Sequence, residues 1–477
     1  MFKNLGNIIL PNCDLDKIAV IDLSKDAQSY SFRHIDQKSN AVARSLLSKN
    51  IKIGDKISIL ADNSVDFISV FFGSMRLGAI PVLINTKLTD SQIKTILIDT
   101  ESKLLFTDQN KKFNLETIQL DNDFENFLNY GNFDCYEPDD SDIAFILYTS
   151  GSHGNPKGVL LTHKNHLWAI SQNINNDLKW ADRRISLIST PLCHTNGITT
   201  FEGSFARQLT VVLLPKFDPI KCIQAIEKYQ VDILFCIPTM LSMMIQEEYI
   251  KTADLSSVQQ IRSASSHLSR PLINSIKQYF PKANIRNSYG LTEVGPALFG
   301  PHPDGIPSPS SSVGYPVQGI EYRIVNEILE IKSPSMMKSY KDGNQDSVTA
   351  DGYFITKDMF RTDQDGFYYF LGRSDDMFKC GGNSVYPSQV EEILESHPCV
   401  VSAVVLGLED DIKGYKPYAF VIIDKNSTVS EEELKKYVLD RGPAYQHPRK
   451  ICFIKEFPWV GGIKIDQQKL KQLLKNH

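Results

Sequence analysis

Short runs of hydrophobic residues alternate with longer amphipathic segments through the first 290 residues of the chain. The runs are rich in Ile, Val, Leu and Phe and are bounded by turn residues, which is typical of buried strands. Five of them lie at 17–23, 56–62, 80–85, 103–108 and 142–150. Between them, residues 32–50 and 64–79 place apolar residues at helical spacing. This alternation predicts an α/β fold, with parallel or mixed sheets flanked by helices.

Strand candidates continue farther along the chain, up to a break near residue 372. Further strands are predicted at 210–215, 232–238 and 327–332, and residues 320–371 look like strand almost throughout, which predicts a β-rich subdomain. A stretch dense in Gly and Asp follows at 372–383. After it, a new unit is predicted with helices at 388–396, 430–440 and 466–475 and strands at 399–406, 417–424 and 450–454. We therefore expect a large N-terminal domain (1–373), a hinge (374–376) and a small, mobile α+β C-terminal domain (377–477).

Composition narrows the class of partner. The chain has 477 residues, with 42% hydrophobic and 22% charged residues and a formal net charge of −5, so it has no overall electrostatic attraction for nucleic acid or an anionic membrane. Its eight cysteines include no C-x-x-C pair, which favours reduced thiols over a zinc site or a disulfide framework. The N-terminus is a poor signal peptide, and no apolar run approaches the roughly 20 residues of a membrane span. A cytoplasmic protein acting on small molecules or proteins is expected.

One local motif points to phosphate chemistry. Tyr148-Thr-Ser-Gly-Ser-His-Gly-Asn-Pro-Lys-Gly158 directly follows a predicted strand and precedes a predicted helix. Glycines let a backbone approach phosphate closely, amides and hydroxyls donate to its oxygens, and lysine supplies positive charge. It is not a Walker A loop, because Gly158 and not Ser or Thr follows Lys157. The alternative interpretation is a Gly/Ser-rich surface turn.

Six further motifs follow in a fixed order along the chain. They are Pro191-Leu-Cys-His194-Thr-Asn-Gly197, Asn287-Ser-Tyr289-Gly290-Leu-Thr292-Glu293, Ser312-Val-Gly314-Tyr-Pro316, Thr356-Lys-Asp358, Gly372-Arg373-Ser-Asp375-Asp376 and Lys464-Ile-Asp466. With the phosphate motif, this set resembles the adenylate-forming superfamily of AMP-dependent synthetases and ligases: acyl-CoA synthetases, adenylation domains of nonribosomal peptide synthetases, and firefly luciferase. The resemblance covers essentially the whole chain.

The resemblance implies a role for each motif. Pyrophosphate would be held by Thr149, Ser150, Gly151, Ser152, Gly154 and Lys157, and the nucleotide also by Asn287, Tyr289 (adenine), Gly290, Thr292 (α-phosphate), Asp358 (ribose) and Arg373. Glu293 would bind Mg²⁺, and Lys464 would meet the carboxylate and the α-phosphate together. His194 would gate an acyl pocket that includes Ser263, Ala264, Ser265 and Gly290, while the thiol would pass Lys379, Gly381 and Gly382. Asp375 would be the hinge residue.

Three positions depart from the family pattern. His153 stands where a second hydroxyl residue is usual, Lys357 replaces the glycine of a T-G-D motif, and Ile463 precedes Lys464 where glycine is usual. Every charged or metal-binding role keeps a suitable residue type, so an active enzyme is expected.

The resemblance implies an acid–thiol ligase of the acyl-CoA synthetase type (EC 6.2.1.-). ATP would activate a carboxylic acid to an acyl-adenylate, releasing pyrophosphate, and the thiol of CoA would then displace AMP. The pocket candidates offer no acidic residue for an amino acid's ammonium group, which favours a fatty or aromatic acid. Two alternatives remain open: loading of the acid onto the phosphopantetheine of a carrier protein, and an inactive relative that serves as a binding module.

Overall fold

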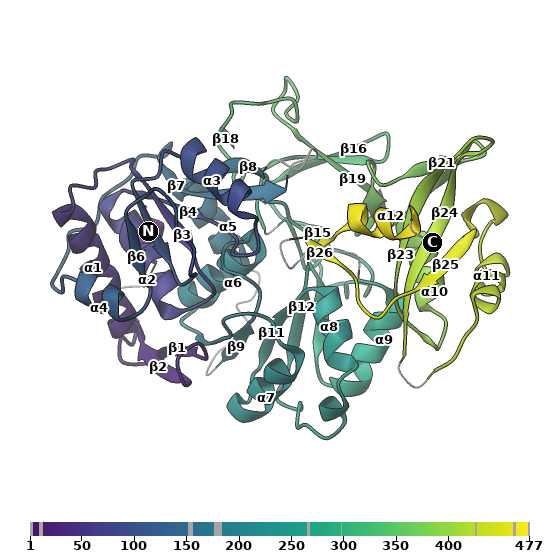
Figure 1. The fold of residues 1–477 in the computed structure, drawn as a ribbon, viewed down its shortest axis with the longest axis horizontal. Coiled ribbons are helices and arrows are strands. Elements are labelled where there is room, and N and C mark those ends of the chain that lie inside the picture. Colours follow the sequence, from purple (N-terminus) through teal and green to yellow (C-terminus); the bar gives the residue numbers. More distant parts are fainter. Residues whose placement is uncertain are drawn as a thin grey trace.

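Every hydrophobic run predicted as a strand in the first 290 residues forms one. The computed structural model describes residues 3–8, 13–150, 156–175, 184–264, 268–296, 298–424, 427–460 and 464–475. Two seven-stranded sheets dominate the large domain, and most of their neighbouring strands are parallel (Figure 1). The prediction of mixed α/β sheets flanked by helices is confirmed.

The first sheet has the order β13-β12-β11-β9-β10-β1-β2, and only the edge strand β2 is antiparallel to its neighbour. Its strands are β1 (Ile18–Asp22), β2 (Gln28–Ser31), β9 (Ile185–Ile188), β10 (Thr210–Leu213), β11 (Ile233–Cys236), β12 (Gln260–Ser263) and β13 (Asn284–Asn287). The helices linked to it are α6 (Thr195–Ala206), α7 (Pro219–Tyr229), α8 (Pro238–Ile245) and α9 (Arg270–Tyr279).

The second sheet has the order β18-β8-β7-β4-β3-β5-β6 and becomes antiparallel at β8 and β18. Its strands are β3 (Lys56–Leu60), β4 (Ile80–Leu83), β5 (Leu104–Thr107), β6 (Thr117–Gln119), β7 (Ile143–Ser150), β8 (Pro156–Thr162) and β18 (Ser339–Tyr340). The helices of this part are α1 (Phe32–Ser48), α2 (Val65–Leu77), α3 (Asp90–Asp99), α4 (Asn122–Phe127) and α5 (His163–Asn175).

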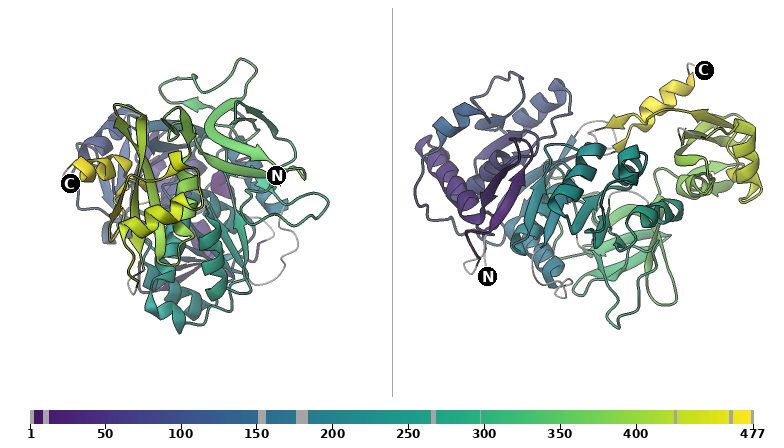
Figure 2. Two further views of the ribbon diagram at one scale, coloured as in Figure 1. Left: turned by 90° about the vertical axis from the view of Figure 1, so that its right-hand side faces the viewer. Right: turned by 90° about the horizontal axis from the view of Figure 1, so that it is seen from below.

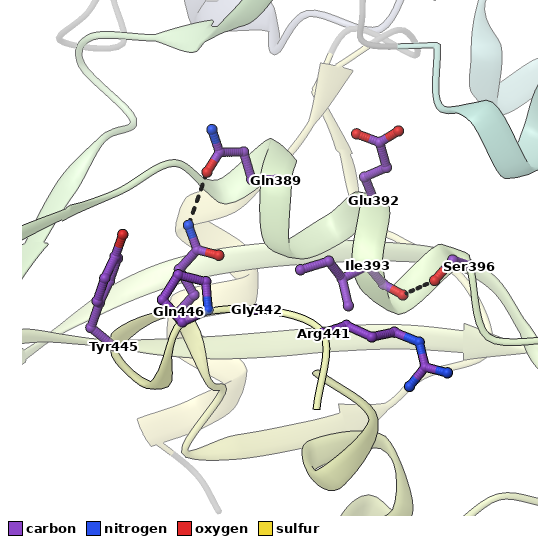
Figure 3. Close-up of a pocket in the computed structure, with 9 residues that line it drawn as sticks. Gln389, Glu392, Ile393, Ser396, Arg441, Gly442, Tyr445 and Gln446 are labelled. Atoms are coloured by element: carbon purple, nitrogen blue, oxygen red, sulfur yellow. Dashed lines mark hydrogen bonds between the residues drawn. The ribbon is translucent and has the colours of Figure 1, made fainter. Parts of the chain in front are cut away.

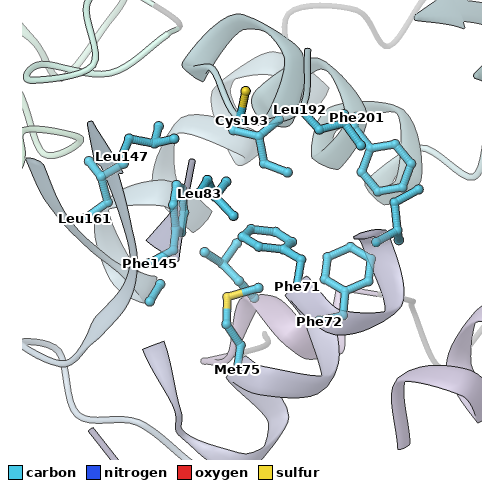
Figure 4. Close-up of a cluster of buried hydrophobic side chains, with 14 of the residues drawn as sticks. Phe71, Phe72, Met75, Leu83, Phe145, Leu147, Leu161, Leu192, Cys193 and Phe201 are labelled. Carbon is cyan, nitrogen blue, oxygen red and sulfur yellow. The ribbon is translucent and has the colours of Figure 1, made fainter. Parts of the chain in front are cut away.

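The main hydrophobic core joins the two large sheets. Aromatic and aliphatic side chains of α2, α6 and β7 pack together there, including Phe71, Phe145 and Phe201 (Figure 4). Leu192 and Cys193 are part of the same buried cluster. The core therefore fixes the backbone immediately before His194, which is the N-cap residue of α6.

A smaller antiparallel sheet, β16-β17-β19-β20, forms the predicted β-rich subdomain. Its strands are β16 (Glu321–Val325), β17 (Ile328–Lys332), β19 (Phe354–Thr362) and β20 (Tyr368–Arg373), and a short pair nearby consists of β14 (Phe299–Gly300) and β15 (Tyr315–Pro316). The adjacent strands β19 and β20 place Asp358 opposite Arg373. Two of the predicted nucleotide residues are therefore cross-strand neighbours.

The small domain sits at one end of the molecule and has hydrophobic clusters of its own (Figures 1 and 2). Its elements are β21 (Phe378–Cys380), β22 (Asn383–Val385), α10 (Pro387–Glu395), β23 (Val400–Asp410), β24 (Gly414–Ile423), α11 (Glu431–Leu439), β25 (Lys450–Phe453), β26 (Trp459–Val460), β27 (Lys464–Ile465) and α12 (Gln467–Lys475). The hairpins β21–β22 and β26–β27 were not predicted.

Three short 3₁₀ helices complete the described elements: η1 (Leu5–Asn7), η2 (Glu248–Lys251) and η3 (Ala444–Gln446). Across the described ranges, no helix is both long enough and apolar enough to span a membrane.

Candidate active site

The predicted phosphate loop connects β7 to β8. Thr149 and Lys157 face each other across this antiparallel pair, so both flank the loop. Gly151, Ser152 and Gly154, with His153, lie outside the described residues, as does the side chain of Ser150. The ammonium group of Lys157 lies over the ring of Tyr340, 5.3 Å from its centre, because β18 pairs with β8. Such a contact is a cation–π interaction.

Tyr340 links this lysine to the predicted metal ligand. Its hydroxyl donates to Oε1 of Glu293 at 2.9 Å. Burial and the neighbouring Glu293 raise the pKa of Tyr340 well above its usual range, which keeps the phenol protonated as a donor. The backbone N–H of Met337 also donates to the carbonyl of Glu293 at 2.8 Å. Glu293 is thus held from two sides by the segment that carries β18.

The loop after β13 brings two motifs into contact. The hydroxyls of Thr292 and Thr195 lie 2.5 Å apart, which ties this loop to the first residue of α6. Gly290 is required by close packing: a Cβ there would lie 2.7 Å from the carbonyl oxygen of Gly295. Asn287 is the last residue of β13 and is paired in register with Ser263 of β12. These residues lie at the carboxyl ends of parallel strands, where open α/β sheets bind ligands.

Asp358 is the centre of a buried polar cluster. The hydroxyl of Tyr289 donates to its Oδ2 at 2.6 Å, and Nη1 of Arg373 donates to its Oδ1 at 3.1 Å. Burial and the carboxylate of Asp358 raise the pKa of Tyr289 well above its usual range, so this phenol also remains a donor. The Tyr289 ring packs edge-on against Phe360, with ring centres 4.9 Å apart. The tyrosine predicted to contact adenine therefore also holds the predicted ribose ligand.

His194 contacts the loop that follows β4. It begins α6 but makes no side-chain capping bond, and its Nε2 lies 2.9 Å from Nδ2 of Asn85, in the loop after β4. Burial raises the pKa of the neighbouring Cys193 thiol to about 12, so Cys193 has no nucleophilic thiolate at neutral pH. The contact with Asn85 orients the imidazole ring of His194.

The acyl-pocket candidates are described only in part. Ser263 ends β12 and Ala264 follows it, beside the Tyr289 loop, where the Ser288 N–H donates to the carbonyl of Ser263 at 2.7 Å. The hydroxyl of Ser263 is buried and has no hydrogen-bond partner among the described residues. Ser265 lies outside the described residues.

The candidate residues of the small domain divide into two groups. Lys379 lies on β21, and Gly381 and Gly382 form the turn to β22 with φ values of +58° and +84°. Positive φ at both central residues is what a tight hairpin turn requires, which explains the Gly-Gly pair. Lys464 begins β27 and pairs with Val460; its side chain is not described. The two groups lie on different hairpins of one domain.

Two cavities among the described residues bear on the site. The smaller, about 220 Å³, is bordered by Asn85, Lys87, Cys193 and Lys216 of the large domain and by Trp459 of β26. It therefore lies beside the His194 motif and between the domains. The larger, about 470 Å³, lies wholly in the small domain between α10 and residues 441–446 (Figure 3). It contains none of the predicted site residues.

Sequence reasoning missed Tyr340, Asn85 and Trp459. Tyr340 and Asn85 touch predicted site residues, and Trp459 reaches the cavity beside them. None of the three lies in a motif that was singled out. Trp459 lies five residues before Lys464. This proximity to a predicted site residue is the signal in the sequence that could have indicated Trp459.

Comparison with known proteins decides the family. Residues 12–340 match the family model described as AMP-binding enzyme, and residues 389–460 match that of the AMP-binding enzyme C-terminal domain. The chain belongs to the AMP-binding enzyme family. The predicted superfamily is therefore confirmed, and the family's two regions occur here in the expected order.

Relatives of this family match along nearly the whole chain. A 2-succinylbenzoate–CoA ligase of Bacillus cytotoxicus is 28% identical over 473 residues, covering 96% of each chain. An o-succinylbenzoate CoA synthetase of Bacillus subtilis, solved with its acyl-adenylate intermediate, has a TM-score of 0.83 at 26% identity and covers 98% of this chain and 97% of its own. An anthranilate CoA ligase solved with anthranoyl-AMP has a TM-score of 0.89 at 25% identity, with coverage of 98% and 97%. These structures confirm the predicted fold.

Proposed function

We propose that this protein is an ATP-dependent acid–CoA ligase that acts on an aromatic carboxylic acid. The carboxylate oxygen attacks the α-phosphorus of ATP, the bond to pyrophosphate breaks, and an acyl-adenylate forms. The sulfur of CoA then attacks the acyl carbon, and AMP leaves. The observation that carries the proposal is the buried Asp358 between Tyr289 and Arg373, next to the loop of Thr292 and Glu293. The CoA ligases that match over whole chains support the reaction class.

Asp358 suits a ribose diol because an ionised carboxylate accepts several hydrogen bonds. Tyr289 and Arg373 each bond a different carboxylate oxygen, and an ionised carboxylate has about four lone-pair sites. Hydrogen bonds from ribose hydroxyls are therefore compatible with these two contacts. Arg373 lies at the edge of this site with a half-exposed side chain, where it is able to reach the phosphate region as well.

The first step brings two anions together, so its transition state requires positive charge. Lys157 and Thr149 flank the phosphate loop and are assigned to the departing pyrophosphate. Thr292, oriented by Thr195, is assigned to the α-phosphate. Lys464 is assigned to the carboxylate and α-phosphate together, since its hairpin approaches the large domain through Trp459.

The donor set fits Mg²⁺. No group of three or more His, Cys, Asp or Glu side chains suited to a metal occurs within the described ranges. Mg²⁺ commonly takes one or two carboxylates, waters and substrate phosphates, so a single well-held Glu293 meets its needs. When bound there, Mg²⁺ would neutralise phosphate charge. Tyr340 keeps one oxygen of Glu293 occupied and leaves the other for the metal.

The acid and the acceptor are assigned from the site and the relatives together. Ser263 and Ala264 lie beside the Tyr289 loop and offer no acidic group, and the named relatives act on 2-succinylbenzoate and anthranilate, which are aromatic acids. The cavity beside His194 carries Lys87 and Lys216, which suit the phosphates of CoA as it delivers its thiol. We assign His194 to the gate between this cavity and the acyl site.

The small domain is proposed to take two orientations about Asp375. Lys464 and the Gly381–Gly382 turn lie on separate hairpins of one rigid domain, so a single orientation cannot bring both to one reacting centre. In the orientation seen here, Trp459 of β26 borders the cavity beside His194 together with residues of the large domain. This orientation supports an assignment to adenylation.

The test is exchange of labelled pyrophosphate into ATP with a panel of aromatic, fatty and amino acids. Exchange is expected with an aromatic acid, followed by formation of its CoA thioester on addition of CoA. In a parallel assay with a phosphopantetheinylated carrier protein in place of CoA, no thioester should form. No exchange with any acid would contradict the proposal and favour an inactive relative.

A further inference from the structure

Lys357 has a backbone conformation that lysine rarely adopts. Its φ is +61°, in the left-handed region, although it lies within strand β19. The family resemblance has glycine at this position, and glycine takes such a conformation without steric cost. A side chain there is strained, and strain of this kind clusters at functional and switching sites. Lysine at this position therefore calls for a compensating role.

That role is visible in the contacts of Lys357 with the predicted hinge. Its ammonium nitrogen lies 3.4 Å from Oδ2 of Asp375. Its carbonyl oxygen accepts two hydrogen bonds from Ser374, from the backbone N–H at 2.8 Å and from the hydroxyl at 2.9 Å. Side chain and backbone of one residue thus hold two consecutive residues of the hinge.

The same contacts lie next to the nucleotide site. Arg373 bonds Asp358 at 3.1 Å and also lies 3.9 Å from the Asp375 carboxylate. Opposite charges therefore alternate from Asp358 through Arg373 and Asp375 to Lys357. The hinge carboxylate is positioned by two cations, of which Lys357 is the nearer.

We propose that Lys357 is a positioning residue that clamps Asp375 and so favours the small-domain orientation seen here. This rests on the proposed function, in which the other orientation serves thioester formation. Lys357 lies on β19 and Asp375 in the hinge, so we expect rotation about the hinge to break their ion pair. The bonds from Ser374 go to the backbone carbonyl of residue 357, which any residue supplies. The amino group of Lys357 thus adds a bias that a glycine would not supply.

The size of the bias follows from exposure. The side chains of Lys357 and Asp375 are 51% and 52% exposed, so solvent screens their attraction. Exposed pairs of this kind shift an equilibrium by about twofold to fivefold. High ionic strength should remove most of the effect.

The chain offers a closely matched control. Lys332 and Glu321 also lie 3.4 Å apart, with side chains 47% and 58% exposed, and both belong to the same small sheet, away from the hinge. Lys332→Met removes an equivalent surface ion pair without touching Asp375. Any general effect of losing a surface cation appears in both variants.

The experiment measures the interdomain distance directly, without acid or ATP. Fluorophores are attached to unnatural amino acids at Ile98 and Ile412, which are 76% and 90% exposed and lie on the large and small domains. Single-molecule energy transfer then reports the orientation populations. Lys357→Met should shift the ratio of the two populations by about twofold to fivefold away from the present orientation, Lys357→Arg should restore it, and Lys332→Met should leave it unchanged.

A second variant separates strain from charge. Lys357→Gly relieves the left-handed backbone and should give the same population shift as Lys357→Met. In kinetic measurements, both should raise the ratio of thioester formation from synthetic acyl-adenylate to pyrophosphate exchange by about twofold to fivefold. Identical distance distributions for Lys357→Met and Lys332→Met would overturn the clamp. A failure of the proposed function would show instead as absent exchange in the unsubstituted protein, with the distance result unaffected.

Discussion

Replacement of Asp358 tests the nucleotide site most sharply. Asp358→Ala removes the buried carboxylate that Tyr289 and Arg373 hold and that is assigned to the ribose hydroxyls. Hydrogen bonds to a charged group contribute about 1.5–3 kcal/mol each. Loss of about 3 kcal/mol from the two ribose contacts lowers kcat/KM for ATP by roughly a hundredfold. Asp358→Asn keeps one acceptor oxygen and should cost roughly tenfold.

The assay compares ATP with 2′-deoxy-ATP in pyrophosphate exchange. The unsubstituted protein should discriminate against the deoxy nucleotide, whereas Asp358→Ala should treat the two nearly alike, because the contact that distinguishes them is gone. Asp351→Asn is the control, since Asp351 pairs with Arg323 on the same small sheet, away from Tyr289. Melting curves establish that each variant is folded. Retained discrimination in a folded Asp358→Ala protein would refute the ribose assignment.

Three further predictions concern the metal, the two half-reactions and pH. Glu293→Gln should reduce adenylation steeply and recover partly at high Mg²⁺; full activity at ordinary Mg²⁺ would remove Glu293 from the metal site. Lys464→Ala should abolish exchange but spare thioester formation from synthetic acyl-adenylate, and Gly382→Leu should do the reverse; equal loss of both steps would contradict two orientations. Burial between α10 and β23 raises the pKa of Glu391 from its ordinary value of 4.5 to about 8. Ionisation of Glu391 therefore lowers the free energy of unfolding as the pH rises from about 4.5 to about 8. Glu391→Gln should therefore raise the melting temperature at about pH 9 but not at about pH 5, and an equal gain at both would exclude this cause.

The strands of the large domain were predictable because their hydrophobic runs are buried on both faces of parallel sheets. The runs at 56–62 and 80–85 became β3 and β4 with small changes at their ends. The long hairpin β23–β24 was predicted too short. Its outer half reads LEDDIKGYK, which is polar because the tip extends into solvent, with Ile412 90% exposed. A hydrophobic pattern does not reveal a strand segment that is held by backbone hydrogen bonds alone.

The site shows a similar division. Motifs located Tyr289, Asp358 and Arg373, and the folded chain brings these three into direct contact. Tyr340 was not predictable, because it lies on a two-residue strand whose partner β8 is about 180 residues earlier in the chain. Asn85 likewise meets His194 only through the packing of the two large sheets. Contacts of this kind depend on tertiary structure and leave no local signal in sequence.

Lys357 departs from the family pattern without displacing the neighbouring Asp358. In the sequence it is a lysine where the family pattern has glycine, which raises the question of activity. In the structure it keeps the left-handed backbone that glycine would adopt, and Asp358 remains in place beside Arg373. The substitution therefore changes the neighbourhood of Asp375 and leaves the carboxylate of Asp358 where the ribose assignment needs it.

The acyl-adenylate route requires that a carboxylate oxygen of the acid attacks the α-phosphate of ATP. Isotope transfer tests it directly: an aromatic acid that gives exchange is labelled with oxygen-18 in its carboxylate and converted with ATP and CoA to completion. Mass spectrometry should find one labelled oxygen in AMP and none in pyrophosphate. Label in inorganic phosphate with ADP as the nucleotide product, or no label in AMP, would contradict an acyl-adenylate intermediate.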